Sequence, residues 1–159
     1  MIQDKIKDRD SLKRTISRLK NEKKTIVFTN GCFDIMHAGH AGYLEEAKRH
    51  GDILVVGVNS DDSVKRLKGP GRPIMKQDDR LSMLAALESV DFVTVFDEDD
   101  PENIITELSP DAIAKGEDWK EEDIIGSDFV KKSGGKVIRI RFRDGCSTTS
   151  IIKKIRSLR

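Results

Sequence analysis

The feature that most constrains the fold is an alternation of short apolar runs with segments of helical periodicity. Two runs, T-I-V-F-T-N (25–30) and I-L-V-V-G-V (53–58), are rich in β-branched residues. Continuous runs of this kind are typical of parallel strands that helices cover on both faces. Three further runs, 91–96, 111–115 and 136–142, bring the number of expected strands to five. The pattern predicts an α/β fold, namely a Rossmann-like, doubly wound, five-stranded parallel sheet with helices on both faces.

The segments between these runs have helical spacing of apolar residues, apart from one polar stretch. That stretch, 59–76, contains Gly69, Pro70, Gly71 and Pro73, and we expect a loop there. Helices are expected at residues 4–21, 39–50, 77–89, 101–108, 121–133 and 147–157. The chain then consists of an N-terminal helical extension (1–24) and one α/β domain (25–159).

Composition excludes several classes of protein. Charged residues make up 36% of the 159 residues, and no apolar run approaches the ~20 residues of a membrane span. The polar N-terminus does not resemble a signal peptide, so a cytoplasmic location is expected. Cys32 and Cys146 lie far apart, which excludes a disulfide scaffold or a zinc ribbon, and we interpret both as small packing residues.

The net charge of +1 conceals a segregation of charge along the chain. Residues 1–24 carry nine basic and four acidic side chains, residues 25–130 carry ten and twenty-three, and residues 131–159 carry ten and one. Basic ends on an acidic body are compatible with nucleic-acid binding, with a local polyphosphate site, or with solvated helix faces.

Polar, charged and small residues gather where predicted strands end. In doubly wound sheets, ligands bind beyond the carboxyl ends of the strands, at the point where the winding reverses. The windows that deserve attention are therefore 30–40, 59–68, 115–119 and 143–149. All four are rich in Gly, Asp, His, Lys, Ser or Thr, which indicates a binding site.

The first window contains two of the three histidines in the chain. His37 and His40 flank Gly39 where a helix begins, so both imidazoles can approach an anion bound at the helix N-terminus. Such donors could stabilise charge on phosphoryl oxygens in a transition state. Two alternatives are a metal pair with Asp34 as third ligand and a pair of ordinary surface histidines. No P-loop or dinucleotide-binding glycine motif occurs.

Four motifs together resemble a known family. T-N-G-C-F-D-I-M-H-A-G-H, V-N-S-D-D-S-V-K-R-L-K-G, K-G-E-D-W and D-G-C-S-T-T-S-I-I are similar to those of the HxGH-bearing, cytidylyltransferase-like nucleotidyltransferases. They are most similar to the adenylyltransferase domain of bacterial heptose 1-phosphate adenylyltransferases. The resemblance implies that residues 25–159 form a nucleotidyltransferase domain, here without the sugar-kinase domain that often precedes it.

The same resemblance implies an activity and its partners. An adenylyl group would pass from ATP to D-glycero-D-manno-heptose 1-phosphate, giving ADP-heptose for surface polysaccharide and releasing pyrophosphate. Mg²⁺ would accompany the ATP and bridge the departing pyrophosphate through water and phosphate rather than through protein ligands. The alternatives are a glycerol-3-phosphate cytidylyltransferase and, from another class, a non-catalytic nucleotide- or RNA-binding module.

Candidate site residues follow from the four windows and from the resemblance. His37 and His40 are expected to be catalytic together with Lys65 or Lys68, which the spacing does not separate and which could form a mobile basic flap. The expected nucleotide-binding residues are Gly31, Cys32, Phe33, Asp34, Gly39, His40, Arg80, Lys115, Gly116, Asp118, Ser147, Thr148 and Thr149. The expected substrate-binding residues are Asn59, Asp61 and Trp119.

Expected partners are limited to these small molecules and further copies of the chain. The basic residues near the predicted phosphate sites favour an enclosed polyphosphate site over a broad nucleic-acid surface. The expected assembly is a homodimer, the default for a soluble enzyme, or a higher homo-oligomer. The N-terminal helix could form dimer contacts or could simply cover the sheet.

Overall fold

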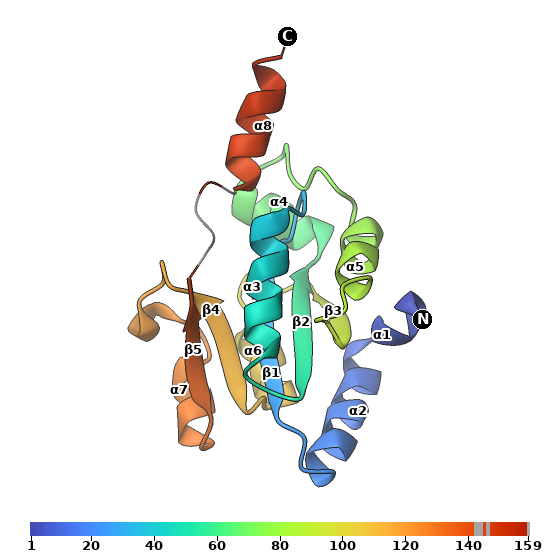
Figure 1. Cartoon of the computed structure of the whole chain (residues 1–159), viewed down its shortest axis with the longest axis vertical. Helices are drawn as coiled ribbons and strands as arrows, with labels where there is room; N and C mark the ends of the chain where they lie inside the picture. Colours follow the sequence, from blue (N-terminus) through green and yellow to red (C-terminus); the bar gives the residue numbers. More distant parts are fainter. Residues whose placement is uncertain (142–144, 146, 159) are drawn as a thin grey trace.

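The computed structural model describes residues 1–141, 145 and 147–158 and contains one parallel sheet (Figure 1). Its strand order is β3-β2-β1-β4-β5. The bounds are β1 Ile26–Gly31, β2 Ile53–Asn59, β3 Phe92–Phe96, β4 Ala112–Gly116 and β5 Lys136–Ile140. In the central pairings, Val27 lies opposite Leu54 of β2 and Ala112 of β4. The prediction of a doubly wound, five-stranded parallel sheet is confirmed.

Helices cover both faces of the sheet. On one face lie α3 (Ala38–Lys48) and α5 (Gln77–Ala85), which bury Leu44 and Leu84 against strand residues such as Val56. The other face is covered by α2 (Arg9–Asn21), α6 (Glu102–Leu108) and α7 (Ser127–Lys132). The winding therefore reverses between β1 and β4, and a cleft is expected at their carboxyl ends.

The predicted N-terminal helix 4–21 is interrupted in the structure. A short helix α1 (Ile2–Lys5) precedes α2, and between them Ile6 forms a parallel bridge with Val93. Asp8 then caps α2 by accepting a hydrogen bond from the Ser11 N–H at 2.8 Å. Because α2 buries Leu12 and Ile16 in the core, it covers the sheet.

The prediction of a loop throughout 59–76 is wrong for its first half. Helix α4 (Asp61–Lys68) begins after Ser60, whose Oγ accepts from the Ser63 N–H at 3.0 Å. The helix buries Ser63 and Val64, and Gly69 follows it with φ 96°. Gly and Pro beyond residue 68 dominated the sequence pattern and concealed this short helix.

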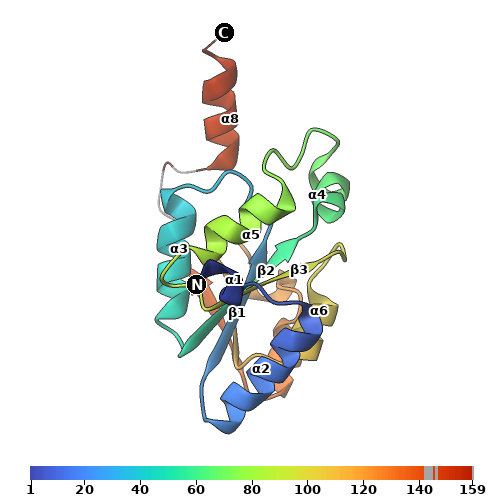
Figure 2. The same ribbon diagram turned by 90° about the vertical axis from the view of Figure 1, so that its right-hand side faces the viewer.

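Other helix boundaries differ more modestly. The expected helix 121–133 is divided into a 3₁₀ turn η1 (Glu121–Asp123) and α7, because Gly126 adopts φ 85° between them. Helix α8 (Thr148–Arg156) agrees with the expected 147–157 but stands clear of the body (Figures 1 and 2). Within the described ranges, no helix is long and apolar enough to cross a membrane.

Candidate active site

A cleft of about 520 Å³ lies at the carboxyl ends of the strands, where the winding reverses. Segments distant in sequence line it, including the loops after β1, β3 and β4 and the beginning of α8. Its lining residues are Asn30, Gly31, Cys32, Phe33, Asp34, His40, Asn59, Leu67, Lys68, Arg72, Asp99, Asp100, Pro101, Lys115, Trp119, Asp123, Ile124, Ile125, Thr148 and Thr149. Each of the four predicted windows contributes some of its described residues to this lining.

His37 and His40 form a stacked pair at the beginning of α3, with ring centroids 3.9 Å apart. His37 Nδ1 accepts from the Gly39 N–H at 3.1 Å, and His40 Nδ1 accepts from the His37 N–H at 3.4 Å. A neutral imidazole that accepts through Nδ1 carries its proton on Nε2. Both rings therefore have an Nε2–H available as a donor.

The surroundings of the two histidines favour their uncharged forms. Burial lowers the pKa of His37, and burial together with neighbouring His37 lowers the pKa of His40 to about 4. Phe33 contributes to this environment, because its ring centroid lies 5.5 Å from that of His40. The pair therefore offers directed, neutral N–H donors.

The loop that carries the histidines has an unusual backbone. Phe33 and Ile35 adopt φ values of 49° and 55°, which lie in the left-handed region that side chains other than Gly disfavour. Between them, the side chain of Asp34 is fully buried. Its carboxylate accepts from Arg72 Nε at 2.6 Å and from the N–H groups of Ile74 and Met75, both at 2.8 Å.

These contacts give Asp34 a structural role that its sequence position does not reveal. Burial disfavours its ionised form, but the two backbone donors and the Arg72 guanidinium hold the pKa of Asp34 below its usual range. The carboxylate thereby fastens the segment after α4 to the loop after β1. Arg72, which the sequence analysis missed, is brought into the cleft wall; its only sequence signal is a basic residue within G-P-G-R-P.

The two candidate lysines occupy different positions on α4. Lys68 lines the cleft, whereas Lys65 does not and instead lies 3.7 Å from the exposed carboxylate of Asp62. They are three positions apart and therefore lie on the same side of the helix, but only Lys68, the last residue of α4, reaches the cleft.

Arg80 and Asp61 lie beneath the site and do not line the cleft. The side chain of Arg80 is fully buried, and its guanidinium donates to the carbonyl of Cys32 at 2.6 Å and to that of Met75 at 3.1 Å. It also donates to Asp61 Oδ1 at 2.8 Å. These bonds hold the first turn of α4 and the loops after β1 and α4 in one arrangement.

The segment after β4 forms another wall. Lys115 and Trp119 line the cleft, and the Lys115 ammonium lies 5.9 Å from the centroid of the indole ring. Burial lowers the pKa of Lys115 to about 8, against the opposing effect of the Asp118 carboxylate. Gly116 is buried and Asp118 is exposed, and neither belongs to the cleft lining.

Strands β1 and β2 and the loop after β1 add neutral groups to the cleft. Buried Asn59 donates through Nδ2 to Ser63 Oγ at 3.0 Å, and its Oδ1 lies 4.0 Å from the sulfur of Cys32. Burial raises the pKa of the Cys32 thiol. Asn30 Oδ1 is also buried and has no hydrogen-bond partner in the described chain, which leaves an acceptor at the cleft.

The three hydroxyl residues at the start of α8, Ser147, Thr148 and Thr149, make different contacts. Ser147 caps the helix by accepting from the Ser150 N–H at 3.0 Å. Thr148 and Thr149 line the cleft, and Thr148 Oγ1 donates to the Asp34 carbonyl at 2.9 Å. Gly39, beside the histidines, is buried and lies outside the lining. Arg143, Asp144 and Cys146 fall outside the described residues.

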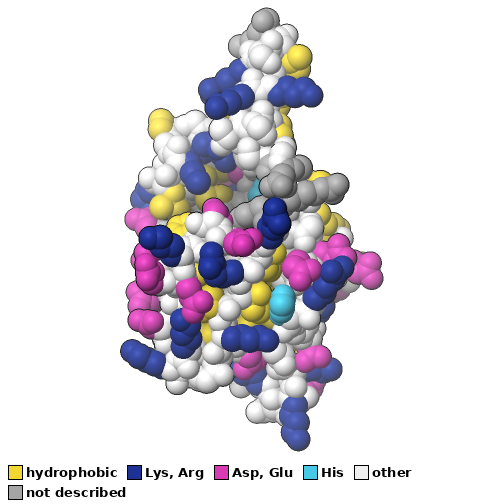
Figure 3. Space-filling model, turned by 60° about the vertical axis from the view of Figure 1, so that its left-hand side comes forward, with side chains coloured by type: hydrophobic (Ala, Val, Ile, Leu, Met, Phe, Trp, Pro, Cys, Tyr) yellow, Lys and Arg dark blue, Asp and Glu magenta, His cyan; other side chains and the backbone are white. Residues whose placement is uncertain are grey.

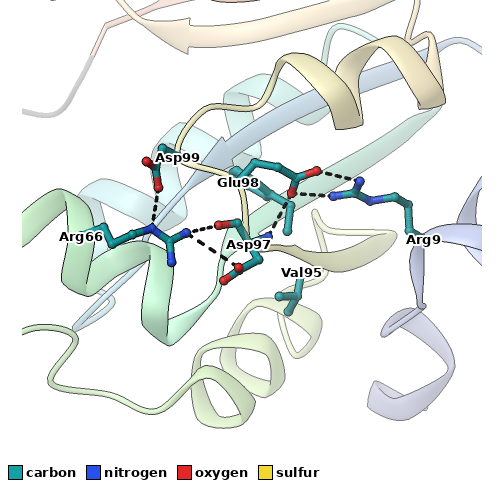
Figure 4. A pocket seen from close by; sticks show the side chains of 7 residues that line it. Arg9, Arg66, Val95, Asp97, Glu98 and Asp99 are labelled. Carbon is teal, nitrogen blue, oxygen red and sulfur yellow. Dashed lines mark hydrogen bonds and ion pairs between the residues drawn. The ribbon is translucent and has the colours of Figure 1, made fainter.

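An acidic wall was missing from the sequence analysis, because the windows omitted the residues after β3. Asp99, Asp100 and Pro101 line the cleft there. Figure 4 shows two arginines that bind this loop. Arg9 of α2 makes paired hydrogen bonds of 2.8 Å to both carboxylate oxygens of Glu98, and Arg66 Nε donates to Asp99 at 2.7 Å.

The described side chains do not favour a metal bound by the protein alone. No group of three or more His, Cys, Asp or Glu residues within that part of the chain could hold a metal ion. In the alternative His37, His40 and Asp34 set, both Nδ1 atoms and the buried carboxylate already accept hydrogen bonds from the protein. The groups that remain are donors suited to phosphate oxygens.

Comparison with known proteins agrees with this geometry. Residues 28–154 match the family model described as Cytidylyltransferase-like. The chain belongs to this family. It is 57% identical over 139 residues to the bifunctional protein HldE of Campylobacter fetus and 52% identical over 148 residues to that of Pasteurella multocida. These alignments cover 87% and 93% of the chain but only 30% and 31% of the relatives, so the chain spans about a third of their length.

Solved structures show the same fold. A lipopolysaccharide core biosynthesis protein from Thermoplasma volcanium aligns with 34% identity and a TM-score of 0.62, over 76% of this chain and 97% of that chain. A pantoate-beta-alanine ligase from Francisella tularensis aligns with a TM-score of 0.57 over 87% of this chain and 67% of its own. Since the latter is 16% identical, it supports only the fold.

Proposed function

We propose that the chain transfers the adenylyl group of ATP to D-glycero-D-manno-heptose 1-phosphate, forming ADP-heptose for lipopolysaccharide or another surface polysaccharide. The observation that carries this proposal is the pair of neutral imidazoles at the start of α3, whose Nε2–H groups remain free to donate. The relationship to HldE proteins and to the T. volcanium lipopolysaccharide protein supports the sugar substrate.

The reaction needs alignment and charge stabilisation rather than a general base. The phosphate of the sugar is ionised at neutral pH, so its oxygen can attack the α-phosphorus of ATP directly. A new oxygen–phosphorus bond forms, the bond from the α-phosphorus to the bridging oxygen breaks, and pyrophosphate leaves. His37 and His40 donate to the α-phosphoryl oxygens as their charge increases. Lys68 and Arg72 hold the β- and γ-phosphates.

The remaining candidate residues would bind the nucleoside and sugar. Lys115 and Trp119 shape one wall, Thr148 and Thr149 offer hydroxyls, and Asn59 reaches the cleft from β2. Arg80 and Asp61 would act from beneath by fixing the loops. Mg²⁺ bound with the triphosphate would neutralise charge on the leaving group, held by phosphate oxygens and water.

The N-terminal extension (1–24) would support this machinery, which we assign to residues 25–159. Arg9 of this extension donates to Glu98 in the loop after β3, and no residue of the extension lines the cleft. We place the enzyme in the cytoplasm, where ATP is available.

The test is pyrophosphate release with ATP or CTP crossed with heptose 1-phosphate or glycerol 3-phosphate. We expect turnover only with ATP and the heptose phosphate. His37→Ala and His40→Ala should each lower kcat by about 10²–10³-fold, because each removes a transition-state donor. Unchanged circular dichroism would show that the variants fold.

Two outcomes would contradict the proposal in different ways. Near-normal turnover in both histidine variants would refute the mechanism. Activity only with CTP and glycerol 3-phosphate would replace the substrates by those of the cytidylyltransferase alternative while leaving the reaction type intact.

A further inference from the structure

Helix α8 presents an apolar stripe that begins at half-buried Ile151 and continues into residues that stay exposed in the described chain. Ile151, Ile155 and Leu158 recur at helical spacing, and the side chains of Ile155 and Leu158 are 58% and 77% exposed. No residue of α8 is buried. Among the described residues, its only hydrogen bond to the body is the one from Thr148 to the Asp34 carbonyl.

Basic residues border this stripe. In a helix, Lys154 and Arg156 fall on opposite sides of the line through Ile151 and Ile155, and Lys153 lies behind them. No acidic residue occurs between 148 and 158. Figure 3 shows hydrophobic and basic side chains on the projecting end of the molecule, with no acidic ones on this face.

A surface of the opposite character lies at the mouth of the cleft. We call residues 117–125, between β4 and α7, the rim segment. Its acidic residues are Glu117, Asp118, Glu121, Glu122 and Asp123, against a single base, Lys120. It also exposes two large apolar side chains, Trp119 at 48% and Ile125 at 42%. An apolar centre with an acidic border complements an apolar stripe with a basic border.

The two surfaces cannot meet within one copy as the structure arranges them. Helix α8 extends away from the sheet, whereas the rim segment lies at the side of the body (Figures 1 and 2). Pairing of α8 with a second α8 would oppose like charges. A twofold axis, however, would place each α8 on the rim segment of the other copy and form the contact twice.

We propose that α8 docks on the rim segment of a second copy of this chain, forming a symmetric dimer. The partner's helix then covers Trp119 and Ile125, which line the cleft, while Thr148 and Thr149 of that helix line the cleft of its own copy. Each active site is then bordered by both copies. The proposed reaction does not by itself require this arrangement.

Sedimentation velocity over a dilution series tests this without any substrate. The wild-type chain should reach twice 17.9 kDa and dissociate reversibly on dilution. Ile155→Asp should raise the dimer dissociation constant by at least about 30-fold, because it places a charge in the centre of the interface. Lys13→Glu, a charge reversal at an exposed position on α2, should leave the dissociation constant unchanged.

A charge exchange tests the proposed pairing itself. Lys154→Glu and Glu122→Lys should each weaken the dimer by about threefold to tenfold, and the double variant should recover at least part of that loss. Carbodiimide cross-linking of a mixture of ¹⁴N- and ¹⁵N-labelled chains should join α8 lysines to rim carboxylates between differently labelled copies. Circular dichroism of every variant checks that the helices remain.

Three results would overturn the proposal. The first is a wild-type chain that stays monomeric at all concentrations, and the second is a dimer that all these substitutions leave unchanged. The third is α8–rim cross-links found only within single copies. Monomers that bind anionic lipid vesicles through Ile155 would likewise overturn it and assign α8 to a membrane surface.

Discussion

At the scale of single residues, the sequence does not distinguish Lys65 from Lys68 as the catalytic lysine, whereas the structure places only one of them in the cleft. Lys68 reaches the cleft, whereas Lys65 faces Asp62 in solvent. Lys68→Ala should therefore lower kcat/KM for ATP by about 10–10²-fold, through loss of a phosphate contact. Lys65→Ala is the matched control and should remain within about threefold of wild type. Steady-state pyrophosphate release measures both; an equal loss in both variants would refute the assignment.

His40 provides a prediction about stability and pH. Its folded pKa of about 4 lies below the ordinary 6.5, so between these pH values the unfolded chain binds a proton that the folded chain does not. The free energy of unfolding should therefore decrease as pH falls from 6.5 to 4, by about 1–2 kcal/mol from this residue.

His40→Gln should lack that contribution. Urea unfolding of both proteins at several pH values measures the difference. Near pH 7, the contribution of His40 to the free energy of unfolding should hardly change with pH. If the variant and the wild type lose stability in parallel between pH 6.5 and 4, His40 is not held neutral by its surroundings.

Arg72, which the sequence analysis missed, and Arg80, which it expected to line the cleft, differ from expectation for the same physical reason. Arg72 reaches the site only because Asp34 lies buried 38 positions away and accepts its hydrogen bond. Arg80 was expected at the phosphates, and its burial beneath Cys32 and Asp61 depends on how α4 and α5 pack. Spacing along the chain predicts that a residue lies near a strand end, but packing decides whether its side chain faces the cleft.

At the scale of elements, the strands were the most predictable part. All five predicted runs correspond to strands within one or two residues. The signal is clearest for β1 and β2, because a strand buried on both faces requires an uninterrupted apolar stretch, whereas β5 alternates exposed and buried residues. Short helices with few buried residues were harder. Helix α4 buries only Ser63 and Val64, so its sequence resembles a loop, and Ile6–Asp8 interrupt a periodic pattern by pairing with β3.

The contact between α2 and the loop after β3 gives a prediction at this scale. Hydrogen bonds from Arg9 hold the pKa of Glu98 at about 2, below the ordinary 4.5. The pair therefore stabilises the fold above pH 4.5, and this contribution disappears as pH falls through 2. Arg9→Met should lower the free energy of unfolding by about 1 kcal/mol at pH 7. In the variant, the part of the stability that depends on ionised Glu98 should no longer be lost in acid.

Arg18→Met is the matched control, since Arg18 lies on the same helix and its nearest carboxylate, on exposed Glu22, is 3.9 Å away. Urea unfolding at pH 7 and in the acidic range compares the two variants. A larger effect of Arg18→Met would show that loss of charge on α2, rather than the Glu98 contact, determines stability.

At the scale of the whole molecule, the charge distribution separates an enzyme from a nucleic-acid-binding module. The basic ends do not form one continuous surface, because α2 packs on the sheet while α8 projects from the opposite end (Figures 1 and 2). We expect no measurable binding of a single-stranded RNA oligonucleotide at physiological salt in a filter assay, while ATP binds. Salt-sensitive RNA binding without pyrophosphate release would favour the binding-module alternative.

The hydrogen bond from Thr148 to the carbonyl of Asp34 joins residues 114 positions apart. A ribosome makes the loop after β1 well before it makes the hydroxyls of α8. A nascent chain can therefore assemble most of the sheet while the nucleotide cleft still lacks one wall. If the cleft acts on ATP as proposed, a chain cut before α8 should fold in large part but release no pyrophosphate.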